Sequence, residues 1–79
     1  MSPTVFRYKS YRFFFFSREE ERMHVHVSCP EGEAKFWLEP IVSHNQSHGL
    51  SPRILKELHK VVEERKDEIN RAWKKHFKR

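Results

Sequence analysis

Two histidines separated by one residue, His24 and His26, are the clearest chemical signal in the sequence. The run Met23–Cys29 alternates histidine with valine, and this period of two is typical of a β-strand with two different faces. Both imidazoles then point to one face, while Val25 and Val27 point to the other. Two imidazoles on one strand face can bind a metal together, or can act as an acid and a base.

Three roles for these histidines follow from the residue types. As ligands, His24 and His26 would bind a divalent transition metal, with a third ligand from elsewhere in the chain; no other cofactor is expected. As catalysts without metal, they would exchange protons during RNA cleavage while Lys35 stabilises the developing negative charge. As structural residues, His26 would stack on Trp37 and His24 would bond to the acidic residues 19–21. The candidates for a third metal ligand are Glu21, His44, His48 and His76.

Aromatic and basic residues share the face on which the histidines are expected. Arg12, Phe14 and Phe16 alternate along one predicted strand, and Lys35 and Trp37 lie on another. Rings that stack on bases, with cations that contact phosphates, are typical of surfaces that hold single-stranded nucleic acid. The same residue types are common in protein interfaces. Further phosphate contacts would come from the lysines near the end of the chain, Lys74, Lys75 and Lys78.

The elements that position these residues can be predicted from the hydrophobic pattern. Residues 4–7, 11–16, 23–29 and 34–38 are rich in β-branched and aromatic side chains and predict about four antiparallel strands. The last two form a hairpin whose apolar residues should share one face. We expect Val27 to pair with Phe36, and Cys29 with Ala34. This register leaves residues 30–33 as the loop and places His26 opposite Trp37.

The second half of the chain is predicted to be a loop followed by a helical segment. Residues 41–50 contain a polar run, His44–His48, and are expected to form a loop, and Ser51-Pro52 is a strong helix start. Apolar residues then recur every three or four positions to the end of the chain. An unbroken helix would be about 40 Å long, too long for so small a domain. We therefore expect a kink near residues 64–67, or a helix whose far end reaches a partner.

Together these elements predict one α+β domain over residues 1–79. Residues 1–40 form the sheet, 41–50 the loop and 51–79 the helical part, which packs on the face of Val25, Val27, Phe36 and Leu38. The single cysteine, Cys29, excludes an internal disulfide and fits the cytoplasm. No apolar run is long enough to span a membrane, and no membrane contact is expected. The formal charge of +5 favours anionic partners.

Several segments spread along the chain resemble a small bacterial family catalogued as a domain of unknown function. The segments are Pro3–Phe6, Tyr11–Ser17, His24–Val27, Gly32–Pro40 and Gly49–Ser51, with Ala72, Trp73 and Phe77 near the end. The resemblance implies a member of a toxin–antitoxin-like gene pair. On the family pattern the positions of note are His24, His26, Lys35 and Trp73. The sequence departs from that pattern at Arg22-Met23, where family members often have prolines.

The favoured function is therefore binding. We expect a small basic cytoplasmic protein of a two-protein bacterial module that binds a partner protein or a second copy, and also nucleic acid. The alternative is a nuclease-like toxin that uses His24 and His26, with or without a metal.

Overall fold

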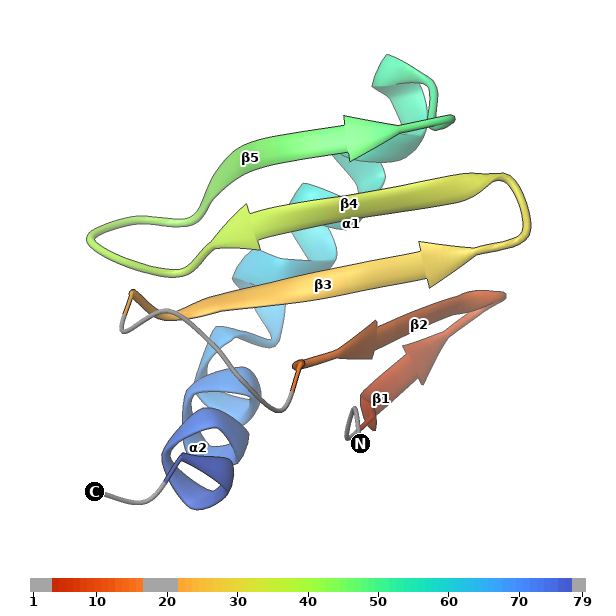
Figure 1. The fold of residues 1–79 in the computed structure, drawn as a ribbon. Helices are drawn as coiled ribbons and strands as arrows, with labels where there is room; N and C mark the ends of the chain where they lie inside the picture. Colours follow the sequence, from red (N-terminus) through yellow and green to blue (C-terminus); the bar gives the residue numbers. More distant parts are fainter. Residues whose placement is uncertain (1–3, 17–21, 78–79) are drawn as a thin grey trace.

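The chain forms an antiparallel sheet followed by two helices. The computed structural model describes residues 4–16 and 22–77. Within these residues there are five strands, each paired with its neighbour in sequence in the order β1-β2-β3-β4-β5. The strands are β1 (Thr4–Tyr8), β2 (Tyr11–Phe14), β3 (His24–Cys29), β4 (Gly32–Trp37) and β5 (Ser43–His48). The helices α1 (Pro52–Glu64) and α2 (Lys66–His76) follow; in Figure 1, α1 passes behind the sheet and α2 lies below β3. The predicted α+β class is confirmed, with one strand more than expected.

The extra strand is β5, so the prediction of a loop over residues 41–50 is wrong. All six residues of β5 are polar, and five of them are exposed. A strand at the edge of a sheet needs no buried side chains, because backbone bonds to β4 hold it in place. The alternation of apolar and polar residues that identified the other strands is therefore missing. The register between β4 and β5 shifts once, between Lys35 and Phe36.

The hairpin of β3 and β4 has the predicted faces but not the predicted register. Val27 pairs with Ala34 rather than with Phe36, and Cys29 pairs with Gly32 rather than with Ala34. A shift of two residues returns every side chain to the same face, so the hydrophobic pattern cannot distinguish the two registers. The loop is correspondingly shorter than predicted.

Gly32 opens β4 at a point where no side chain fits. A Cβ at this position would collide with the carbonyl oxygen of His48 in β5. A glycine therefore lets the two strands approach closely. Gly49, one residue later in the chain than His48, has a φ of +79°, which favours glycine at the exit from β5.

The core lies between the sheet and the helices, as the sequence predicted. Phe13, Val25, Val27 and Phe36 of the sheet are fully buried. They belong to the same cluster as the helix residues Leu58, Val61, Val62, Ile69 and Trp73. The expected packing of the helical part on the Val25 and Phe36 face is confirmed.

The two helices begin and end at recognisable signals. The Ser51 hydroxyl accepts a hydrogen bond of 3.2 Å from the backbone N–H of Ile54 and caps α1. Arg65 separates α1 from α2 with a φ of −111° and a ψ of 21°, values outside the helical region. Its guanidinium lies over the Phe6 ring, 3.6 Å from the ring centre. The expected kink near residues 64–67 is confirmed.

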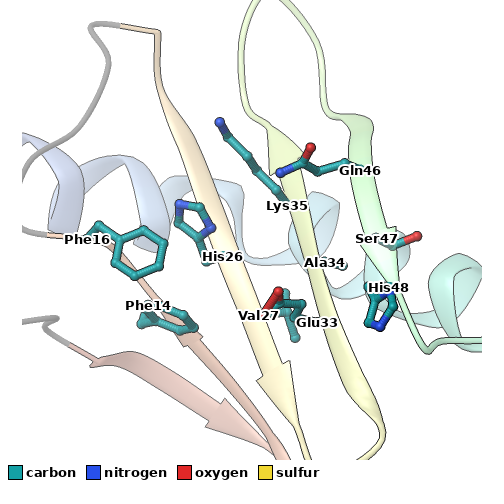
Figure 2. Close-up of a pocket in the computed structure, with 10 residues that line it drawn as sticks. All are labelled: Phe14, Phe16, His26, Val27, Glu33, Ala34, Lys35, Gln46, Ser47 and His48. Atoms are coloured by element: carbon teal, nitrogen blue, oxygen red, sulfur yellow. The ribbon is translucent and has the colours of Figure 1, made fainter.

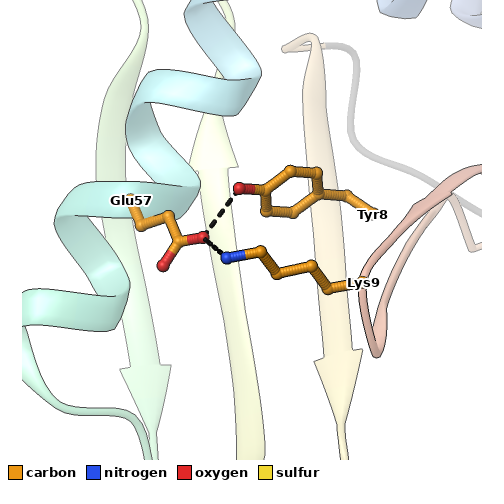
Figure 3. A network of polar contacts seen from close by, with 3 residues as sticks. All are labelled: Tyr8, Lys9 and Glu57. Atoms are coloured by element: carbon orange, nitrogen blue, oxygen red, sulfur yellow. Dashed lines mark hydrogen bonds and ion pairs between the residues drawn. The ribbon is translucent and has the colours of Figure 1, made fainter.

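A polar contact ties the first hairpin to α1 (Figure 3). The Tyr8 hydroxyl and the Lys9 ammonium each donate a hydrogen bond of 2.7 Å to one carboxylate oxygen of Glu57. The bond from Lys9, and then the bond from Tyr8, holds the pKa of the Glu57 carboxyl below its ordinary value. Bonding to this carboxylate in turn raises the pKa of Tyr8 and of Lys9.

Candidate binding face of the sheet

The sheet face turned away from the helices, here called the outer face, carries most of the predicted site residues. Residues paired across antiparallel strands point to the same side. Phe14 pairs with His26, and His26 pairs with Lys35. The pairs of Arg12 with Ser28, His24 with Trp37, Lys35 with Gln46 and Glu33 with His48 extend this face over four strands. The structure thus brings together Arg12, Phe14, His24, His26, Lys35 and Trp37.

Two of the predicted site residues lie on α2 and not on the outer face, and a third lies outside the described residues. Lys74 and Lys75 are exposed in the last turn of α2, on a different element from the outer face. Lys78 lies outside the described residues. Lys74 and Lys75 are therefore not part of the surface that the strands create.

His24 is buried where the end of the sheet meets α2. Its side chain is fully buried, and its ring contacts Trp37 and Trp73 at centroid distances of 5.5 and 5.3 Å. The Nδ1 atom lies 2.7 Å from the backbone carbonyl oxygen of Arg22. A carbonyl oxygen only accepts, so Nδ1 carries the proton and donates it. The hydrogen bond and the two indoles fix the orientation of this ring.

His26 lies two residues further along β3 and packs against phenylalanines. Its ring stacks on Phe14 at 5.5 Å and meets Phe16 edge to face at 4.4 Å. The expected stacking of His26 on Trp37 is wrong, because the two-residue register difference places Trp37 opposite His24. The rings of His24 and His26 are 5.0 Å apart, so the strand does place the two imidazoles side by side.

Cations lie over the aromatic rings of the outer face. The Arg12 guanidinium is 4.5 Å from the centre of the Phe14 ring, and its Nε donates a 2.7 Å hydrogen bond to the Thr4 hydroxyl. The Lys35 ammonium and the Arg22 guanidinium lie 4.5 and 4.1 Å from the centre of the Trp37 ring. Such contacts are attractive and hold positive charge next to apolar surface.

A groove runs across the outer face from β2 to β5. Its volume is about 290 Å³. The groove is lined by Phe14, Phe16, His26, Val27, Glu33, Ala34, Lys35, Gln46, Ser47 and His48. Figure 2 shows the two phenylalanines on one side of the groove, His26 and Glu33 in the middle, and β5 on the other side. The groove therefore combines an aromatic wall with polar and charged groups.

Comparison with known proteins places the chain in a family. The family model described as "Domain of unknown function (DUF4160)" matches residues 10–74. The chain belongs to the DUF4160 family. No curated protein and no solved structure matches the chain. The stretch of the DUF4160 match runs from the turn before β2 to the last part of α2 and includes every groove residue.

The described part of this DUF4160 chain offers two imidazoles for a metal but no third ligand beside them. No group of three or more His, Cys, Asp or Glu residues suited to a metal occurs in residues 4–16 and 22–77. His44 and His76 lie by the core residues Phe36 and Phe15, at ring distances of 5.9 and 6.2 Å. His48 lines the groove across from the phenylalanines. Glu21, another candidate ligand, lies outside the described residues.

Several residues of the candidate site were not predicted from the sequence. Arg22 lies just before β3 and reaches Trp37. Glu33 and Gln46 line the groove because β5 is a strand and because β4 begins at Gly32, and His48, considered from the sequence only as a metal ligand, lines it too. Once residues 43–48 are known to form a strand, the alternation of its side chains predicts that Gln46 and His48 lie on the outer face. None of the helices in the part of the chain that the structure describes has the length and hydropathy needed to cross a bilayer.

Proposed function

We propose that this DUF4160 protein is a small, basic, cytoplasmic binding protein of a bacterial two-protein, toxin–antitoxin-like module. Its outer face binds an anionic partner, either an acidic segment of a protein or a nucleic acid. The observation that carries this proposal is the set of cations held over aromatic rings on the outer face of the sheet, which α2 contacts at one end, through Trp73 and His24. Positive charge held next to aromatic rings suits a negatively charged partner.

The surroundings of the two histidines support binding over catalysis. A general base must reach the proton that it removes. His24 is fully buried, and its Nδ1 already donates to a backbone carbonyl. Only His26 of this pair lines the groove. A nuclease-like toxin remains the second candidate function, because the two imidazoles are 5.0 Å apart.

Titration of the purified protein tests the binding proposal. The probes are a labelled pool of single-stranded RNA and a labelled acidic peptide, each at two salt concentrations. The face variant Arg12→Ser/Lys35→Ser removes two positive charges from the outer face. The matched control Lys74→Ser/Lys75→Ser removes the same charge from α2. We expect the face variant to weaken binding of at least one probe by about tenfold or more, and the control to weaken it much less.

Two outcomes would contradict the proposal. If both double variants weaken binding equally, binding depends on net charge and not on the outer face. If neither probe binds, the outer face is not an anion-binding surface. Gel analysis of the RNA after the titration tests the second candidate: cleavage that is lost in both His24→Gln and His26→Gln would establish a nuclease.

A further inference from the structure

The groove on the outer face has an aromatic wall in which the ring of Phe16 is open to solvent and the ring of Phe14 is buried. The Phe16 side chain is 46% exposed. Its ring meets Phe14 edge to face at 5.3 Å and His26 at 4.4 Å. Three rings therefore support one another at this side of the groove. A planar ring from a ligand can stack or pack against such a wall.

The position of the groove restricts how a ligand can be recognised. The groove crosses β3 and β4, which each have a paired strand on both sides. Their backbone groups are used within the sheet, so an extended peptide cannot add to them as a further strand. The volume of about 290 Å³ lies at the lower end for ligand sites, and fits one ring system better than a length of peptide.

The polar groups of the groove favour one kind of ring. Among the described residues that line it, Glu33 is the only one with a carboxylate. A carboxylate only accepts hydrogen bonds, so it prefers a ring edge with two adjacent donors. Guanine has such an edge, formed by its N1–H and its amino group. Adenine and cytosine place an acceptor beside their amino group, and uracil places a carbonyl on each side of its N–H.

The surroundings of the groove supply the charge that a nucleic-acid strand requires. Lys35 lines the groove, and Arg12 lies over Phe14 beside it. Both can approach the phosphates that flank a bound base. An acidic peptide would also contact these cations, but it would bring its carboxylates towards Glu33. Charge and ring chemistry together favour a nucleic acid.

We propose that the groove holds one unstacked guanine of a single-stranded nucleic acid. The base packs against Phe14 and Phe16, and its N1–H and amino group donate to the Glu33 carboxylate. This inference rests on the proposed function and narrows the anionic partner to one class. RNA and DNA strands share the recognised chemistry.

Fluorescence anisotropy with short oligouridine probes tests this inference. The probes carry one central guanine, adenine or inosine, or uridine throughout, and inosine is guanosine without the amino group. We expect the guanine probe to bind about tenfold more tightly than the others. Glu33→Gln should abolish this preference. The matched control Glu31→Gln, in the turn before β4, should keep it, and melting curves confirm that both variants fold. A DNA version of the guanine probe shows whether the sugar matters.

The other outcomes of this experiment contradict either the guanine inference alone or the proposed function as well. Equal affinity for all oligonucleotides, or a preference that survives Glu33→Gln, overturns the guanine inference but leaves the outer face as a binding surface. Binding of the acidic peptide without binding of any oligonucleotide overturns the inference and assigns a protein partner. Binding of neither class overturns the proposed function as well.

Discussion

His24 and His26 are neighbours on one strand face, but they have different surroundings. His24 is enclosed by Trp37 and Trp73 at the end of the sheet. His26 faces the groove between Phe16 and Lys35. The difference comes from α2, which brings Trp73 to His24. At the scale of single residues, one histidine belongs to the packing and the other to the candidate site.

This division predicts different effects of substituting the two histidines. His24→Ala should lower the free energy of unfolding by about 2–4 kcal/mol, because it leaves a cavity and takes the hydrogen-bond donor away from the Arg22 carbonyl. His26→Ala should lower it by about 1 kcal/mol, while weakening ligand binding in the groove. Urea denaturation measures the first effect, and titration with a single-stranded RNA probe measures the second. Equal destabilisation by both substitutions would contradict the division.

From the sequence it could be predicted that His24 and His26 share one face of the strand, but not how exposed each of them is. Alternation along Met23–Cys29 is a local property, and it correctly placed both imidazoles opposite Val25 and Val27. Burial of His24 depends on Trp73, which is far away in the sequence. The third metal ligand that the sequence suggested is not found beside the pair in the described residues. Spacing in the sequence alone could not show this.

At the scale of elements, register and edge strands were the hard parts to predict. A shift of two residues in the β3–β4 hairpin preserves both faces, so the hydrophobic pattern could not distinguish the registers. In the observed register, Gly32 opens β4 where β5 approaches closely. The close approach of β5 to Gly32 could not be predicted from the sequence, because β5 itself carries no apolar pattern. The helix start at Ser51-Pro52 and the break at Arg65 were predictable, since both depend on local signals. The groove was missed because one of its sides, formed by Gln46, Ser47 and His48, lies on β5.

The contact between the first hairpin and α1 predicts a dependence of stability on pH. The pKa of Glu57 is lowered in the folded protein by the bonds from Lys9 and Tyr8. A lowered carboxyl pKa stabilises the fold above the ordinary value of 4.5, and this contribution is lost as the pH falls through the lowered pKa. Glu57→Gln should therefore reduce the melting temperature slightly at neutral pH.

Melting curves of the wild type and Glu57→Gln between neutral and acidic pH measure this contribution. The difference between the two proteins should shrink to nothing once the pH is below the lowered pKa. Lys56→Gln, a change of the neighbouring exposed residue, serves as the control. A difference that stays constant down to strongly acidic pH would mean that the Glu57 carboxylate does not stabilise the fold through these bonds.

At the scale of the whole molecule, the two faces of the sheet have different surroundings. Both helices lie on one side, where the apolar face of the sheet is buried. The cations Arg12, Arg22 and Lys35 lie by the outer face. Binding of single-stranded RNA to this face alone should involve about three phosphates.

The salt dependence of RNA binding measures the number of these phosphate contacts. Three cations, each releasing about 0.7 counterion from a single strand, give a slope of about −2 for the logarithm of the association constant against the logarithm of salt concentration. Lys35→Gln should make the slope shallower by about 0.7. A slope of −4 or steeper would show that further cations, such as Lys74 and Lys75, also contact the strand.

The order of the strands has a consequence for how the chain folds during synthesis. Each strand pairs with its neighbour in sequence, so the sheet can form by closing short loops one after another. The helices that cover its apolar face come last in the chain. On the ribosome, the sheet therefore emerges with Phe13, Val25 and Phe36 facing water until α1 and α2 follow. We expect aggregation of this chain to begin from that partly folded state, before its helices have left the ribosome.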